Sequence, residues 1–243
     1  MYICTMKAKD TFIELVRTTI PHGYESTLYH LFPKYEMDAF GNIFVKVGDE
    51  SPSVLFTSHL DTYSKGEPET IKHKVSKDFI KTNGKTILGA DDKAGVTILL
   101  SMINAEIPGL YYFFSAEEIG RIGSRFALES DEFKKNSRKL KKVISFDRNG
   151  YDSIITHQCG KRTCSDQFAQ NLKSTLNQYG FRMDLDITGG YTDSYTFVDY
   201  KNIENCTNIS VGYFNHHTTS EKQDISFLES LCKASCEIDW TEM

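Results

Sequence analysis

The sequence predicts an α/β protein, a three-layer sandwich with a mostly parallel, mixed central sheet. Three apolar runs have the length of strands that are buried on both faces: 54–58, 110–114 and 143–146. Segments with the apolar spacing of helices lie between and around these runs. Strands that alternate with helices favour a layered fold around a parallel sheet. No repeat, low-complexity tract or linker is visible, so we expect one domain over residues 1–243.

The remaining elements follow from local patterns along the chain. Apolar spacing and end signals predict helices at 12–16, 28–32, 92–105, 165–179 and 225–238. Further strands are expected at 43–47, 153–156, 183–187 and, as the last one, 207–211. Residues 71–75 and 78–82 resemble a hairpin at the edge of the sheet, closed by Asn83-Gly84. The basic, polar residues 130–142 predict a solvated helix or loop.

Composition argues against several classes of partner. A net charge of −5 provides neither a basic surface for nucleic acid nor a polybasic patch for a membrane. No apolar run reaches the roughly 20 residues of a membrane-spanning helix, and no signal peptide is visible at Met1–Lys7. Without an export signal, the six cysteines are expected to be free thiols. We therefore expect a cytoplasmic protein that binds neither nucleic acid nor a membrane.

The segment 89–95, Gly-Ala-Asp-Asp-Lys-Ala-Gly, places two adjacent carboxylates between glycines at the start of a predicted helix. Asp91 or Asp92 could simply cap that helix, because negative charge is favourable at a helix N-terminus. The alternative is a carboxylate that bridges metal ions. The acids and histidines elsewhere in the chain favour this alternative for one of the two.

Side chains with the chemistry of metal ligands follow the predicted buried strands or begin the next helix. They are His59 and Asp61, Asp91 and Asp92, Glu117 and Glu118, Asp147, and His216 or His217. Ligands bind at the carboxyl ends of the strands in an open α/β sheet, so these five segments should meet at one edge. So many carboxylates would repel one another unless cations were bound. Two divalent ions that share a carboxylate are usual in hydrolases, and imidazole with carboxylate ligands suits Zn²⁺, with Co²⁺ or Mn²⁺ possible.

Asp61 lies two residues beyond His59, so the two side chains point to the same side of a strand. The Asp61 carboxylate can then accept the second imidazole N–H of His59. Such a contact fixes the tautomer of a ligating histidine.

The chain resembles the co-catalytic zinc exopeptidases, which include peptidase T-like tripeptidases, glutamate carboxypeptidase-like enzymes and tetrahedral-assembly aminopeptidases. Four motifs between about residues 21 and 221 carry the resemblance: His-Leu-Asp-Thr at 59–62, the segment 89–95, Glu-Glu-Ile-Gly at 117–120 and a late His-Thr-x-x-Glu. The resemblance implies a zinc-exopeptidase (phosphorylase/hydrolase-like) fold and two Zn²⁺ ions per chain.

The resemblance also implies a role for each motif. Asp91 would bridge the two metals, His59 and Asp147 would complete one of them, and Glu118 with the late histidine the other. Glu117 would be the general base that takes a proton from the metal-bridging water, since it remains free of the metals.

The late histidine has two candidates. His217 begins His-Thr-Thr-Ser-Glu and matches the motif better than His216, which would then support the ligands or face the substrate. Asp92 is expected to be a cap or a support. Residues 189–193 resemble the family's Gly-Gly-x-Thr-Asp segment near the substrate, which makes Tyr191, Thr192 and Asp193 candidates for substrate contacts. An oxyanion donor, if one is needed, could be Tyr191, His216 or Arg148.

These observations predict a dinuclear metal-dependent exopeptidase that acts on short peptides, most simply an aminopeptidase. One alternative is an N-acyl amino-acid amidase or deacylase with the same metals, and another is an inactive relative that binds peptides. Many relatives insert a lid or dimerisation domain where this chain has only residues 148–188. We therefore expect a single catalytic domain without a lid, and its oligomeric state stays open.

Overall fold

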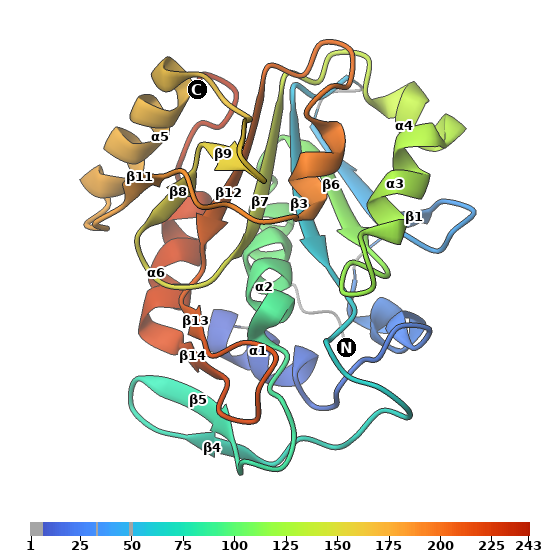
Figure 1. Cartoon of the computed structure of the whole chain (residues 1–243), viewed down its shortest axis with the longest axis vertical. Coiled ribbons are helices and arrows are strands. Elements are labelled where there is room, and N and C mark those ends of the chain that lie inside the picture. The colour runs from blue at the N-terminus through green and yellow to red at the C-terminus, as the bar shows by residue number, and fades with distance from the viewer. Residues whose placement is uncertain (1–6, 33, 49–50) are drawn as a thin grey trace.

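The computed structural model describes residues 7–32, 34–48 and 51–243. An eight-stranded sheet forms its centre (Figure 1). In spatial order the strands are β1 (Glu36–Met37), β2 (Ile43–Val47), β6 (Gly109–Phe114), β3 (Val54–His59), β7 (Lys142–Arg148), β12 (Asn205–Ser210), β8 (Ser153–Ile155) and β11 (Asp184–Asp186). The strands β6, β3, β7 and β12 run parallel, as do β8 and β11, and the other neighbouring pairs are antiparallel. The predicted mostly parallel, mixed sheet is confirmed.

Helices cover both faces of this sheet and complete the predicted three layers. One face carries α1 (Ala8–Leu15), the 3₁₀ helix η2 (Glu25–Leu31), α2 (Ala90–Asn104), α5 (Asp166–Gln178) and α6 (Ile225–Ser235). The other face carries α3 (Ile122–Glu129), α4 (Asp131–Asn136) and the 3₁₀ helix η3 (Asp193–Phe197). In Figure 1, α2 crosses the middle of the sheet, with α6 beside it.

The two faces of the sheet belong to two separate apolar clusters. In β3, Val54 and Phe56 pack in the cluster that contains α2, whereas Leu55 packs in the cluster on the other face. All six residues of β3 and of β6 are buried. Burying a large apolar side chain contributes roughly 1.5–3 kcal/mol. A strand with such side chains on both faces gains this energy fully only when a layer of helices covers each face. This is why the strands that hold the candidate site are the ones with continuous apolar runs.

A second, four-stranded sheet corrects the prediction for residues 71–82. In spatial order it contains β13 (Tyr213–Phe214), β14 (Lys222–Asp224), β5 (Phe79–Thr82) and β4 (His73–Val75). The expected hairpin therefore exists but pairs with the late strand β14, rather than with the central sheet. Its turn lies at 76–78, because the Ser76 hydroxyl bonds both the N–H and the C=O of Phe79. Strand 207–211 is not the last one, since β13 and β14 follow it.

Other local predictions need smaller corrections. The segment 28–32 forms a 3₁₀ helix instead of an α-helix. Residues 130–142 are not fully solvated, because α4 buries Phe133 and Lys142 begins β7. A short hairpin, β9 (His157–Gln158) and β10 (Lys161–Arg162), was not expected. The described cysteines are free thiols as predicted, while Cys4 lies outside the described residues. Within the described part of the chain, no helix has the length and apolar character to cross a bilayer.

Gly95 lets α2 pack directly against the end of β7. A Cβ at this position would lie 2.1 Å from the carbonyl oxygen of Phe146 and 2.6 Å from Asp92 Oδ1. We expect Gly95→Ala to destabilise the protein by about 1–3 kcal/mol, because neither neighbour can move cheaply. Urea unfolding of this variant beside Gly190→Ala, whose Cβ would meet nothing within 4 Å, checks the prediction. Equal midpoints for the two variants would show that this close approach has no effect on stability.

Candidate metal centre and active site

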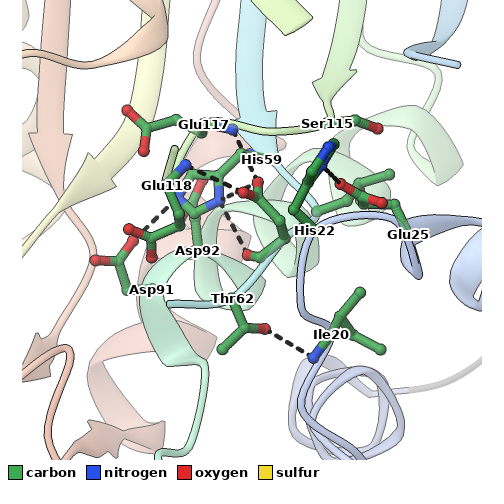
Figure 2. A network of polar contacts seen from close by, with 12 residues as sticks. Ile20, His22, Glu25, His59, Thr62, Asp91, Asp92, Ser115, Glu117 and Glu118 are labelled. Atoms are coloured by element: carbon green, nitrogen blue, oxygen red, sulfur yellow. Dashed lines mark hydrogen bonds and ion pairs between the residues drawn. The ribbon is translucent and has the colours of Figure 1, made fainter. Parts of the chain in front are cut away.

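The predicted ligands come from five segments that meet at the carboxyl ends of the parallel strands. His59 is the last residue of β3, Asp91 lies in the first turn of α2, and Glu118 follows β6. Asp147 lies near the end of β7, and His217 lies in the loop between β13 and β14. Figure 2 shows the carboxylates of Glu117, Glu118 and Asp91 on the same side of the His59 ring.

Asp91 lies between the two histidines, and each of its oxygens faces one of them. Asp91 Oδ1 is 3.1 Å from His59 Nε2, and Asp91 Oδ2 is 3.3 Å from His217 Nε2. His217 Nε2 is also 3.0 Å from Glu118 Oε2, and His59 Nε2 is 3.8 Å from Asp147 Oδ1. One carboxylate therefore connects two sets of ligand-type atoms, one around His59 with Asp147 and one around His217 with Glu118.

Asp61 holds both the first histidine and the Glu-Glu segment. His59 Nδ1 lies 3.1 Å from the carbonyl oxygen of Asp61 and 3.4 Å from its Oδ1. The Asp61 carboxylate also accepts hydrogen bonds from the backbone N–H groups of Glu117 and Glu118, at 3.0 and 3.1 Å. This fully buried side chain thus orients residues from β3 and from the end of β6 together.

Asp92 has hydrogen-bond partners that differ from those of Asp91. Its oxygens accept hydrogen bonds from the Ser58 hydroxyl at 2.6 Å and from the Gly95 N–H at 3.1 Å. The second of these bonds satisfies a free N–H in the first turn of α2. The peptide bond between Asp91 and Asp92 is cis. The two adjacent acids differ in their contacts: Asp91 faces the rings of both histidines, whereas Asp92 caps the helix and also places an oxygen near His59 and Asp147.

Glu221 and Lys93 also position the start of α2, although the motifs alone assigned no role to either side chain. The buried Glu221 carboxylate accepts hydrogen bonds from the N–H groups of Leu88 and Gly89, both at 2.8 Å, and of Asp91 at 3.1 Å. The fully buried Lys93 ammonium donates to the carbonyl oxygen of Leu60 at 2.5 Å. Burial lowers the pKa of Lys93, and nearby acids, Asp61 foremost, oppose this. The only sequence signal for either residue is its place inside a motif.

The titration of the cluster reflects its excess of acids. Burial alone would lower the pKa of His217, but hydrogen bonds to Asp91 and Glu118 raise it to about 10. His59 behaves alike, since its bonds to carboxylates outweigh burial and raise its pKa. Burial raises the pKa of Asp147 well above its usual range, and the neighbouring aspartates add to this. The surrounding acids thus favour positive charge at both histidines, and bound cations would supply such charge.

The donor set fits divalent metal ions. Among the described residues, three groups offer ligand atoms that all lie within 4.8 Å of one another: His59, Asp91 and Glu118; Asp91, His216 and His217; and His59, Asp92 and Asp147. Imidazole and carboxylate are the ligands of Zn²⁺ and related ions. His216 lies beside His217, with 4.7 Å between the ring centroids, and the His217 ring is stacked on Tyr63 at 4.3 Å.

A cavity of about 200 Å³ opens onto this cluster. Its lining includes Asp91, Glu117, Glu118, Asp147, Arg148, Tyr191, Thr192, His216 and His217. Asp193 is buried at the start of η3, where burial raises its pKa to about 7. The hydroxyl of Thr192 and Oδ1 of Asp193 have no hydrogen-bond partner among the described residues. The predicted substrate-facing residues thus line the cavity, except Asp193.

Comparisons with known proteins identify relatives of the whole fold and of shorter segments. The fold is similar to that of aminopeptidase PepT from Bacillus cereus ATCC 10987, with a TM-score of 0.76 and 17% identity over 95% of this chain and 97% of that chain. Peptidase T of Aeromonas hydrophila is 42% identical over 67 residues, which are 24% of this chain and 16% of that protein. The uncharacterized protein YqjE of Bacillus subtilis is 36% identical over 83 residues, 31% of this chain and 22% of that protein.

The matched segments therefore cover only about a fifth or less of the length of each of these two curated relatives. The likeness to PepT confirms the predicted fold class. The family model of Peptidase family M28 matches residues 42–226. This range makes up most of the chain and includes all the predicted metal ligands. In agreement with the predicted resemblance to the co-catalytic zinc exopeptidases, the chain belongs to Peptidase family M28.

Proposed function

We propose that this chain is a dinuclear metal-dependent aminopeptidase that hydrolyses short peptides. The observation that carries the proposal is the position of Asp91, whose two oxygens face His59 and His217 at 3.1 and 3.3 Å. A carboxylate that binds a single metal ion, or that caps a helix, is not expected to have a histidine next to each of its two oxygens. Family membership supports a peptidase, since the family is named for that activity.

In this proposal each ion has its own ligands, and Asp91 is shared. His59 and Asp147 would hold one ion, and Glu118 with His217 the other, with Zn²⁺ first and Co²⁺ or Mn²⁺ as alternatives. Two such ions would lower the pKa of a water molecule towards neutrality and polarise the scissile carbonyl. Asp61 contacts the Nδ1 side of His59, which would leave Nε2 available to bind the ion.

Glu117 is the proposed general base. It lines the cavity, and its backbone N–H is fixed by Asp61 at 3.0 Å. It belongs to none of the ligand groups among the described residues. Burial raises the pKa of the Glu117 carboxyl well above its usual range; His59 opposes this, and Asp193 adds to it. A carboxylate with a raised pKa accepts a proton from the attacking water and returns it to the leaving amine.

The small, acid-lined cavity supports action at a free amino terminus. Its volume of about 200 Å³ is below the roughly 300–1,000 Å³ of pockets for drug-sized ligands. Glu117, the acid of the lining that the proposal leaves free of metal, can attract an α-ammonium group. The proposal treats the chain as one catalytic domain without a lid, because only residues 148–188 lie between Asp147 and Gly189.

Substrate preference and metal dependence test the proposal together. We expect leucyl anilides and di- or tripeptides with a free amine to be cleaved, and N-acetyl amino acids to be left intact. Removal of metal with a chelator should abolish this activity, and Zn²⁺, Co²⁺ or Mn²⁺ should restore it. Cleavage of the N-acetyl substrates alone would identify an amidase or deacylase instead. Metal-free protein with full activity would refute the proposed chemistry.

A further inference from the structure

The cavity beside the candidate metal centre has one cationic side chain that the proposed chemistry does not use. Among the described residues that line it, Arg148 is the only Lys or Arg, whereas Asp91, Glu117, Glu118 and Asp147 line it as acids. The Arg148 side chain keeps 27% of its surface exposed. We propose that Arg148 is a specificity-determining residue that binds a carboxylate group of the peptide substrate.

A β-bulge explains how Arg148 reaches the same cavity as Asp147. Side chains of neighbouring residues on a regular strand point to opposite faces. In β7, however, two residues, Phe146 and Asp147, lie opposite Ile209 alone, because the register shifts between Ser145 and Arg148. An extra residue of this kind bends the strand and redirects its side chains, often next to active sites.

The guanidinium group is held in place by its neighbours. Arg148 Nη2 is 3.2 Å from Asp186 Oδ2 and 3.1 Å from the Thr188 hydroxyl oxygen. Asp186 is itself fixed by the Ser153 hydroxyl at 2.8 Å and by the Thr188 N–H at 2.7 Å. An arginine that is oriented before binding loses little side-chain freedom when a ligand arrives.

Charge then determines where an anionic group can lie in the cavity. A substrate carboxylate is repelled by the free acid Glu117 and attracted by Arg148, which is positively charged at every relevant pH. Guanidinium and carboxylate groups also match in geometry, and their hydrogen bonds are charge-assisted. Because the cavity holds about 200 Å³, the carboxylate of a peptide must be near the scissile bond to reach Arg148. This favours di- and tripeptides with a free α-carboxylate, or peptides with an acidic side chain near the cleaved bond.

The inference rests on the proposed peptidase function. Three probes distinguish a failure of the Arg148 inference from a failure of the peptidase proposal. The probes are Leu-Gly-Gly, its C-terminal amide, and Leu-Gly-Glu amide, which has only a side-chain carboxylate. We expect the wild type to prefer Leu-Gly-Gly over its amide by at least tenfold in kcat/KM. In Arg148→Gln the kcat/KM of Leu-Gly-Gly should fall at least tenfold, through KM, while that of its amide changes less than threefold. Arg148→Lys should restore part of the preference, because lysine supplies the charge without the planar fork.

Controls distinguish a binding role from a structural one. Arg182→Gln removes the same charge from an exposed position outside the cavity and should leave the preference unchanged. If Arg148→Gln lowers kcat/KM equally for the acid and the amide, Arg148 only ties β7 to the 186–188 segment and the proposal is wrong. A preference of the wild type for Leu-Gly-Glu amide over Leu-Gly-Gly amide, lost in Arg148→Gln, would assign the bound group to the side chain.

Binding measurements keep the test independent of turnover. In the metal-loaded Glu117→Gln background, calorimetry should give a lower Kd for Leu-Gly-Gly than for its amide. The additional Arg148→Gln change should remove that difference. Wild-type cleavage of all three probes with equal kcat/KM would overturn the carboxylate inference and leave the peptidase proposal intact. Absence of any cleavage would refute the peptidase proposal, while the Kd comparison would still decide on Arg148.

Discussion

Glu117→Gln is expected to retain its metal ions and to lose at least 10²-fold in peptidase activity. The substitution keeps the size of the side chain and the backbone N–H that bonds Asp61, but it removes the proton acceptor. General acid–base catalysis contributes about 10²–10⁴-fold to enzymatic rates, so the loss should fall in that range. Metal analysis and kcat on Leu-Gly-Gly, measured on the same preparation, give the two values.

Glu129→Gln is the matched control for this variant. Its side chain is 79% exposed at the end of α3 and does not line the cavity, so the same chemical change occurs outside the site. We expect less than a twofold change in kcat. Equal activity of Glu117→Gln and the wild type would refute the role of Glu117 as general base. Loss of metal in Glu117→Gln would instead show that this side chain is a ligand.

Asp91→Asn has the second large expected effect, the loss of at least one of the two ions and about 10³-fold or more of the activity. An amide can offer one oxygen but not two, so it cannot replace a carboxylate whose oxygens face His59 and His217. Metal ions stabilise transition-state charge by several kcal/mol, which corresponds to this loss in rate. Elemental analysis after gel filtration, together with kcat, measures both quantities.

Asp92→Asn separates the two adjacent acids. Burial raises the pKa of Asp92 well above its usual range, and its oxygens accept hydrogen bonds from the Ser58 hydroxyl and from the backbone N–H groups of Gly95 and His59. We expect this variant to bind metal like the wild type and to lose some thermal stability. If Asp92→Asn loses metal and Asp91→Asn does not, the assignment of the shared carboxylate is reversed.

The strands that hold the candidate site could be predicted because their signal is local. The runs at 54–58, 110–114 and 143–146 are mostly apolar, which is the pattern expected of strands that are buried on both faces. His59 and Asp147 follow their runs directly and Glu118 comes four residues after its own, so parallel pairing brings these three to one edge of the sheet. Positions at strand ends are therefore readable from sequence once the strands are recognised.

The parts that could not be predicted depend on contacts between distant segments. Glu221 bonds the N–H groups of Leu88 and Gly89 from more than 130 residues away, and β14 pairs with β5 across a similar separation. Strands of two or three residues such as β13 and β14 carry no alternation that a pattern could detect. The bulge that brings Arg148 into the cavity is likewise a matter of register between β7 and β12.

The ratio of bound metal to chain at full activity tests the central claim most directly. Metal-free protein is titrated with Zn²⁺, and bound metal and the rate of Leu-Gly-Gly hydrolysis are measured at each step. A centre shared through Asp91 predicts that activity reaches its maximum at two ions per chain. Full activity at one ion per chain, or activity independent of bound metal, would contradict the account.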